Sequence, residues 1–132
     1  MALLVPDVGE AAMLDELLKN TTPEAQKLKL YESNTTPAEG DTLASYTQAT
    51  ISGYSAVTFT RGTWGAASTA AGTTTSTYPE QTFTFTGSGT VYGYTIEKVT
   101  ATTLLWSELI FSGGQAFISG DVLKLTVKLQ MA

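Results

Sequence analysis

From Pro23 onward, polar and apolar residues alternate along much of the chain, and this alternation limits the possible folds more than any other feature. Residues 82–86 read Thr-Phe-Thr-Phe-Thr, and residues 122–131 place Leu, Leu, Val, Leu and Met at every second position. Successive side chains of a β-strand point to opposite faces, so each such run predicts a strand with one buried face. The pattern is typical of antiparallel sheets.

Eight segments carry this pattern clearly or weakly: residues 27–31, 43–49, 56–60, 82–86, 90–100, 104–111, 116–118 and 122–131. The segment 43–49 is the weakest of them. Glycine-bearing turns at residues 87–89 and 113–115 join neighbouring segments. We therefore expect an all-β fold, an antiparallel two-sheet sandwich of jelly-roll type with about eight strands, or alternatively a small closed barrel. The residues expected to be buried are Leu28, Leu30, Phe83, Phe85, Leu125 and Val127.

One segment near the N-terminus reads as a short helix. Pro6 suits a helix entry, and Asp7 followed by Glu10 has the spacing of a capping box. The predicted helix runs from about residue 8 to residue 19, and its apolar stripe consists of Val8, Ala11, Leu14 and Leu18, with Met13 and Leu17 beside it. The chain has 132 residues, which predicts a single globular domain. Within it, residues 1–22 form an N-terminal arm and helix, and residues 23–132 form the β-sandwich.

Residues 62–78 stand apart from the strands around them. They carry no charge and consist mainly of Gly, Ala, Ser and Thr, with Trp64 and Tyr78 as the large side chains. A segment of this length is long for a loop within a compact domain. It is either a mobile surface loop or an arm that becomes ordered against a neighbouring subunit, where an uncharged segment is easily buried.

Charge and hydrophobicity argue against two classes of partner, nucleic acids and membranes. The net charge is −5, and eight acidic residues lie within the first 41 positions against three lysines. Without a basic face the chain cannot neutralise a phosphate backbone, so we expect no nucleic-acid binding. No run approaches the ~20 apolar residues of a membrane helix, so we expect no membrane partner. Only 14% of residues are charged. Such a surface suits a protein covered by partners, and equally a threonine-rich soluble β domain.

The sequence offers little catalytic chemistry. It contains no His and no Cys, which excludes a Ser-His-Asp triad and any His- or Cys-ligated metal. Glu97 and Glu108 could face each other on neighbouring strands as a glycosidase carboxylate pair, but we expect both to be solvated surface residues. Asp41 and Asp121 lie in turns that lack the spacing of a calcium loop. We therefore expect no enzyme, and no catalytic, cofactor or metal site.

The aromatic residues Tyr92, Tyr94 and Trp106 allow two interpretations. They could form a platform on which a sugar stacks, as in β-sandwich lectins. Alternating aromatic residues are also what a sandwich core or a subunit contact uses, and we favour that interpretation.

Three stretches of the sequence together resemble a known group of proteins: Val5–Asn20 (VPDVGEAAMLDELLKN) followed by Leu28–Tyr46, the middle block Val91–Ile110 (VYGYTIEKVTATTLLWSELI), and the closing block Gly120–Ala132 (GDVLKLTVKLQMA). They resemble small virion proteins of tailed bacteriophages, in particular the capsid cement, or decoration, proteins, several of which are jelly rolls. The resemblance covers nearly the whole chain except residues 62–78 and transfers no catalytic residue.

The resemblance implies a structural protein that binds the outer surface of an icosahedral phage head and stabilises it against internal DNA pressure. Its partners would be the major capsid protein and further copies of itself, as a dimer or trimer. The protein would be assembled in the bacterial cytoplasm and located on the capsid surface of the virion. The alternative is a receptor- or carbohydrate-binding module of a phage tail or fibre.

Apolar residues with no evident cover are the candidate partner contacts: Leu3, Leu4, Val5, Leu14, Leu18, Trp64 and Tyr78. An apolar N-terminal tail is expected to fray unless something holds it. The helix stripe either packs on its own sandwich or docks on a neighbouring subunit. In the second case the nearby acidic residues would meet basic groups and set the register.

Overall fold

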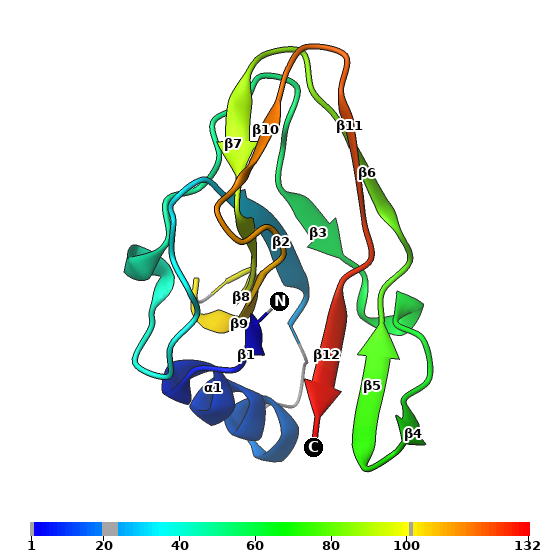
Figure 1. Ribbon diagram of the computed structural model, residues 1–132. Helices are drawn as coiled ribbons and strands as arrows, with labels where there is room; N and C mark the ends of the chain where they lie inside the picture. The colour runs from blue at the N-terminus through cyan, green and yellow to red at the C-terminus, as the bar shows by residue number, and fades with distance from the viewer. Residues whose placement is uncertain (1, 20–23, 101) are drawn as a thin grey trace.

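The computed structural model describes residues 2–19, 24–100 and 102–132 (Figure 1). Within these residues one α-helix, α1 (Asp7–Leu18), accompanies twelve strands that pair in antiparallel fashion. The strands are β1 (Ala2–Leu4), β2 (Gln26–Tyr31), β3 (Val57–Phe59), β4 (Ser68–Ala70), β5 (Thr73–Thr77), β6 (Gln81–Thr84), β7 (Gly89–Val91), β8 (Gly93–Lys98), β9 (Leu104–Leu109), β10 (Gln115–Phe117), β11 (Val122–Leu125) and β12 (Lys128–Met131). The all-β prediction with one N-terminal helix is confirmed.

The largest sheet has five strands in the order β1-β9-β8-β2-β3. Leu28 lies opposite Ile96 and Leu30 lies opposite Tyr94, so these four side chains share one face. Lys29 lies opposite Thr95 and belongs to the other face. The central strand β8 is therefore covered on both sides, which explains why Gly93–Glu97 are all buried.

Two long antiparallel ribbons extend beyond this sheet. The pair β7–β10 follows the pair β8–β9 along the same two chain segments. Similarly, β5 pairs with β12 and β6 pairs with β11, and a hydrogen bond from Tyr78 N to Val127 O (2.9 Å) links the two pairs. In the view of Figure 1, β6 and β11 lie above β5 and β12, and β7 and β10 lie above β8 and β9.

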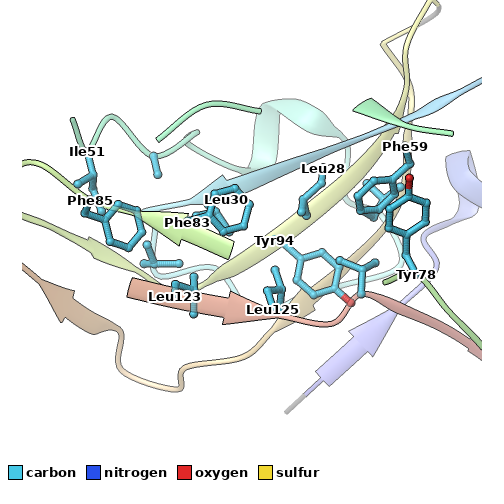
Figure 2. Packing of buried hydrophobic residues seen from close by; sticks show 14 of the residues in the cluster. Leu28, Leu30, Ile51, Phe59, Tyr78, Phe83, Phe85, Tyr94, Leu123 and Leu125 are labelled. Atoms are coloured by element: carbon cyan, nitrogen blue, oxygen red, sulfur yellow. The ribbon is translucent and has the colours of Figure 1, made fainter. Parts of the chain in front are cut away.

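The hydrophobic core lies between the large sheet and the β6–β11 ribbon. Figure 2 shows Leu28, Leu30 and Tyr94 on one side, facing Leu123 and Leu125 on the other. The six residues predicted to be buried are all buried, so this prediction is confirmed: Leu28, Leu30, Phe83, Phe85, Leu125 and Val127. Complete burial of such a side chain contributes about 1.5–3 kcal/mol.

Three predicted strands differ from the observed ones. Residues 43–49 contain a 3₁₀ turn at Leu43–Ser45, because Thr42 and Ser45 exchange capping hydrogen bonds in place of a strand ladder. Residues 90–100 form two strands, β7 and β8, since the backbone of Tyr92 bonds to Tyr31 and to Ile110 at the bend. Residues 122–131 likewise divide into β11 and β12, which pair with different partners.

Residues 62–78 are not a loop without regular structure, since they contain a β-hairpin made of β4 and β5 after a 3₁₀ turn at Arg61–Thr63. The hairpin turns at Ala71 and Gly72, whose φ angles are 50° and 80°. Positive φ at both central residues defines the turn that best fits the twist of a hairpin, and Asn-Gly is its preferred sequence.

The strained turn residue gives a test of the hairpin. Ala71→Asn should raise the free energy of unfolding by about 0.5–1 kcal/mol, because Asn tolerates the left-handed region better than Ala. Urea denaturation measures the change. Ala67→Asn serves as the control, since Ala67 precedes β4 and has no positive φ. Equal effects of the two substitutions would contradict the turn geometry.

Helix α1 begins as predicted, but its cap and its buried face differ from the prediction. Pro6 is the N-cap, and no side chain caps the helix; the amides of Gly9 and Glu10 donate to the Pro6 carbonyl instead. Gly9 is buried, and Ala12 and Met13 pack against the core. Of the two alternatives for the apolar stripe, packing on its own sandwich does not hold for its leucines, since Leu14, Leu17 and Leu18 are 58%, 79% and 75% exposed, respectively.

The N-terminal tail is tied down. β1 pairs with β9 at the edge of the large sheet, with Leu3 opposite Glu108 and Leu4 opposite Ser107. Leu3 and Val5 pack against the core. Residues 2–4 therefore belong to the same sheet as the strands that follow residue 23, and this pairing holds the tail.

Candidate functional site

The acidic residues of the described part of the chain are spread over several elements. No group of three or more His, Cys, Asp or Glu residues there could hold a metal ion. The described residues also contain no helix of the length and apolarity that crossing a membrane requires.

Glu97 and Glu108 are buried, so their prediction as surface residues is wrong. Glu108 lies opposite Tyr94 on the core face, where the Tyr94 hydroxyl donates a hydrogen bond of 2.6 Å to its Oε2. Glu97 lies on the other face of the sheet, where Lys29 Nζ is 2.8 Å from its Oε1. The two carboxylates are separated by the sheet itself and cannot form a glycosidase pair.

The burial of Glu108 affects its aromatic neighbour. Burial first, and the hydrogen bond and charge of Glu108 second, raise the pKa of Tyr94 well above its usual value. Tyr94 therefore remains a neutral hydrogen-bond donor over the whole physiological pH range. Lys128 Nζ lies 4.0 Å from Glu108 Oε1 and supplies the compensating positive charge.

A groove of about 550 Å³ lies between α1 and the strands β2, β5, β9 and β12. Its apolar lining comes from Met13, Trp64, Leu105, Trp106 and Leu129. Pockets of this size with a few converging polar groups are the usual place where proteins bind ligands or partner side chains. We call it the α1 groove.

An aromatic cluster packs around Trp64, one of the residues that line the groove. Trp64 contacts Phe59, Tyr78 and Trp106 with ring centroids 5.7, 5.3 and 5.9 Å apart, respectively. Its indole N–H donates to Gln26 Oε1 at 3.2 Å, which fixes the orientation of the ring. Of the two predicted partner residues here, Tyr78 is buried in this cluster, whereas Trp64 is half-buried and lines the groove.

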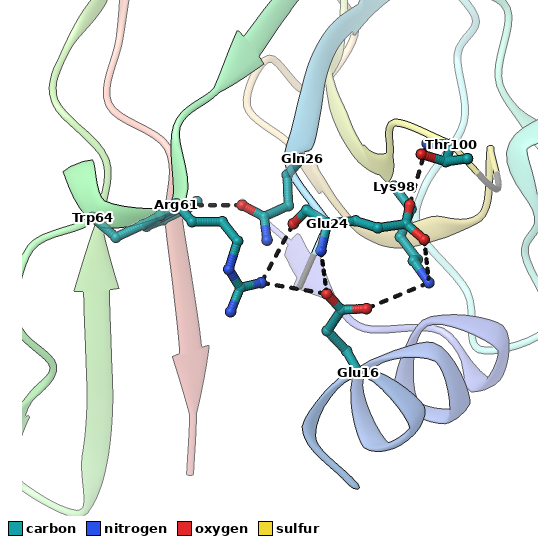
Figure 3. A network of polar contacts seen from close by, with 7 residues as sticks. All are labelled: Glu16, Glu24, Gln26, Arg61, Trp64, Lys98 and Thr100. Carbon is teal, nitrogen blue, oxygen red and sulfur yellow. Dashed lines mark hydrogen bonds and ion pairs between the residues drawn. The ribbon is translucent and has the colours of Figure 1, made fainter. Parts of the chain in front are cut away.

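Four charged side chains form a rim at the end of the groove (Figure 3). Glu16 of α1 lies 3.6 Å from Arg61 Nη1 and 3.5 Å from Lys98 Nζ. Glu24 lies 3.3 Å from the same Lys98 Nζ, and its Oε2 accepts a hydrogen bond from the amide of Thr100 at 3.2 Å. Two acids and two bases balance each other, so the rim attaches α1 to the β-strands without selecting a charged ligand.

The exposed leucines of α1 adjoin the groove. Leu14, Leu17 and Leu18 are spaced as neighbours on one helix face, and Leu17 also lines the groove. Leu14 and Leu18 were among the predicted partner contacts, whereas Leu17, the most exposed of the three, was placed beside the stripe. We call these three residues the leucine face.

The remaining candidates pack within the protein. Leu3 and Val5 contact the core, and Leu4 is half-buried in β1. Tyr94 and Trp106 are buried, which confirms the interpretation of these two as core residues. The sequence shows the three leucines on one side of the helix. It does not show that this side faces solvent, because the orientation of α1 depends on the close approach of Gly9 to β9, which hydrophobic periodicity does not reveal.

No protein family, no curated protein and no solved structure matches this chain. The candidate site is therefore defined by its own geometry, namely the α1 groove, its balanced rim and the leucine face beside it.

Proposed function

We propose that this chain is a structural protein of a phage virion, a cement protein that docks on the outer surface of the capsid and stabilises the shell against the pressure of packaged DNA. The observation that carries the proposal is the leucine face, three large apolar side chains that α1 presents to solvent. Contiguous exposed apolar residues beside a groove are typical of protein-interaction sites. The resemblance to phage virion proteins names the class of partner.

The arrangement of the strands supports the finer part of the proposal, a jelly-roll sandwich of two sheets. The β8–β9 and β5–β12 pairs each continue into a second pair, β7–β10 and β6–β11. Long bent ribbons of this kind are the building units of jelly rolls. The core residues between the large sheet and the β6–β11 ribbon are consistent with two layers.

The charge around the leucine face suits a basic partner surface. Asp7, Glu10 and Asp15 are exposed on the same helix, and Lys19 is paired with Asp15 at 3.2 Å. A capsid protein that presents apolar residues with a basic surround would complement this end of the molecule. Such charges steer association and fix register more than they add affinity. A binding free energy that is modest for one copy is multiplied when several copies of an oligomer bind one lattice.

Replacing the leucine face tests the proposal. The triple variant Leu14→Ala, Leu17→Ala, Leu18→Ala should keep the melting temperature of the isolated protein within a few degrees, because these side chains are exposed and Ala is a good helix former. Its affinity for capsids stripped of the protein should fall at least tenfold, as expected when contact residues are truncated. Co-sedimentation with the capsids measures binding.

The matched control changes two exposed apolar residues at the opposite end of the molecule, Ile118 and Val122, which flank the β10–β11 turn (Figure 1). The variant Ile118→Ala, Val122→Ala should bind capsids like the unchanged protein, and particles that carry it should resist heat normally. If the leucine variant binds as tightly as the control, or if particles without the protein are as heat-stable as complete ones, the cement proposal is wrong.

The α1 groove favours a second candidate, a receptor- or carbohydrate-binding module. Trp64 offers an aromatic lining, and Glu16, Gln26 and Arg61 offer both acceptors and donors to hydroxyl groups. In that case Trp64→Ala would abolish binding to cell-surface glycans and the leucine variant would not. Copy number separates the two functions, since a cement protein is present in hundreds of copies per particle and a tail component in few.

A further inference from the structure

A second, smaller cavity lies on the other side of the large sheet. Its volume is about 200 Å³, and the residues that line it include Lys29, Tyr46, Gln48, Thr95 and Glu97. Lys29 and Thr95 lie opposite each other on β2 and β8, on the face that is turned away from Leu28 and Ile96. The segment that contains the 3₁₀ turn Leu43–Ser45 contributes the opposite wall. We call this the Glu97 cavity.

The carboxylate of Glu97 is incompletely satisfied. The side chain is only 1% exposed, and Lys29 Nζ lies 2.8 Å from Oε1. Nevertheless, neither carboxylate oxygen accepts a well-aligned hydrogen bond from any described residue. Lys29 thus neutralises the charge, whereas Oε2 has no hydrogen-bond donor among the residues that the structure describes. A buried acceptor without a donor costs about 1–3 kcal/mol, so a polar cavity beside it calls for a ligand that donates.

Glu97 lies at an irregularity of the large sheet. The register between β8 and β9 shifts between Ile96 and Glu97, with Ile96 opposite Trp106 and Glu97 opposite Leu104. This irregularity lies in the central strand of the sheet. Bulges re-aim a side chain and occur often beside functional sites. The shifted register and the unsatisfied oxygen are independent observations, and both belong to the Glu97 cavity.

The chemistry of the lining defines the class of ligand. The Lys29–Glu97 pair has no net charge, so a bound cation or anion would stand uncompensated in a buried site. A neutral hydroxyl group can donate to Oε2 and accept from a neighbouring donor. The hydroxyl of Tyr46 is already bonded to Asp41 Oδ2 at 2.7 Å and contacts Ser107 Oγ at 2.8 Å. Thr95 and Gln48 are the other neutral polar groups of the lining, and Gln48 Nε2 also donates to the Tyr54 hydroxyl at 3.2 Å.

We propose that the Glu97 cavity is a binding site for a neutral hydroxyl-bearing molecule that donates a hydrogen bond to Glu97 Oε2. Two sources share this chemistry. One water molecule occupies about 30 Å³ of liquid, so the cavity has room for several ordered waters. It has room equally for a small polyol. This site lies on the far side of the sheet from the core and is independent of the docking proposed for α1.

A polyol titration separates the two sources. The unchanged protein and the double variant Lys29→Met, Glu97→Leu, which removes the acceptor and its counter-charge together, are unfolded thermally in increasing glycerol. Specific binding to the folded state raises the melting temperature of the unchanged protein by an amount that grows with the logarithm of the glycerol concentration, and the double variant lacks this contribution. An excluded osmolyte raises the melting temperatures of both proteins alike, so the difference between the two proteins isolates the effect of bound glycerol. Glu97→Gln, which retains one acceptor oxygen, should keep part of that difference.

A crystal structure without polyol provides the second arm. A water molecule within about 3.2 Å of Oε2 that also contacts at least one other polar group would assign the site to solvent, even if glycerol acts equally on both proteins. A glycerol-dependent rise in melting temperature that the double variant lacks assigns it to polyols. The proposal is overturned if Oε2 is bonded to a protein donor such as Gln48 Nε2, the cavity holds no ordered solvent and glycerol acts equally on both proteins.

Discussion

Lys29→Met is expected to lower the free energy of unfolding by about 3–5 kcal/mol, because it leaves the carboxylate of Glu97 buried without a counter-charge. Glu97 is 1% exposed and Lys29 Nζ, 2.8 Å away, is the cation paired with it among the described residues. The lysine itself is 26% exposed, so its ammonium group reaches water from the rim of the cavity. Removing the lysine therefore strands the less accessible partner. Urea denaturation measures the loss.

Lys27→Met is the matched control. Lys27 lies directly opposite Glu97 in the β2–β8 register and on the same face as Lys29, yet it forms no ion pair with a described residue. Substitution of a half-buried, unpaired lysine should change stability by less than about 1 kcal/mol. A similar loss in both variants would mean that position in the strand, and not the ion pair, determines the cost.

The double variant Lys29→Met, Glu97→Leu should recover most of the stability lost by Lys29→Met. Replacing both members of a buried ion pair by apolar residues of similar volume is often neutral, whereas breaking the pair is costly. The difference between the double variant and the sum of the single variants measures the coupling. If the double variant is as unstable as Lys29→Met, the electrostatic explanation fails.

The Lys29–Glu97 pair also illustrates what could be predicted from this sequence. Alternation identified the strands and their buried residues, because Leu28, Phe83 and Leu125 obey a local rule with period two. The same rule assigned Glu97 to a solvated face. That face is in fact covered by residues 43–48, and a connection of this kind is set by tertiary contacts between distant segments.

The points at which predicted strands divide could not be predicted for a similar reason. The sequence of residues 122–131 alternates without interruption, but β11 pairs with β6 and β12 pairs with β5. The strand therefore divides where its partner segment divides, near Tyr78. The hairpin within residues 62–78 could not be predicted either, because threonine and alanine give only a weak periodic pattern of hydrophobicity. Its hairpin depends on the Ala71–Gly72 turn and on pairing with the C-terminal strand β12.

For the candidate site, the capping spacing and the apolar periodicity identified the helix, but they left open whether its apolar stripe packs on its own sandwich or on a neighbouring subunit. The buried face of α1 is the one that carries Gly9, because a helix packs most closely where its smallest residue allows the approach. The leucine face is exposed as a consequence.

Gly9→Ala consequently provides the sharpest test of how α1 docks. A Cβ atom at residue 9 would overlap the backbone carbonyl of Leu105 on β9, a group that cannot turn aside as a flexible side chain would. In an exposed helix the same substitution stabilises by about 1 kcal/mol. Here we expect a loss of about 1–3 kcal/mol, the usual cost of forcing an extra group into a packed site. A lower free energy of unfolding therefore indicates that α1 packs against β9, and a higher one indicates that it does not.

Urea denaturation gives the sign, and amide hydrogen exchange locates the effect. In the Gly9→Ala protein the amides of α1 should lose protection first, while those of β2 and β8 in the centre of the sheet remain protected. Gly40→Ala is the control, because a Cβ atom there meets no atom within 4 Å and the residue has no positive φ. An increase in stability, equal to the gain expected from helix propensity, would show that α1 does not lie against β9. If α1 is displaced, the leucine face is displaced with it. On the proposed cement function, Gly9→Ala should then also weaken binding to capsids, although residue 9 itself is buried.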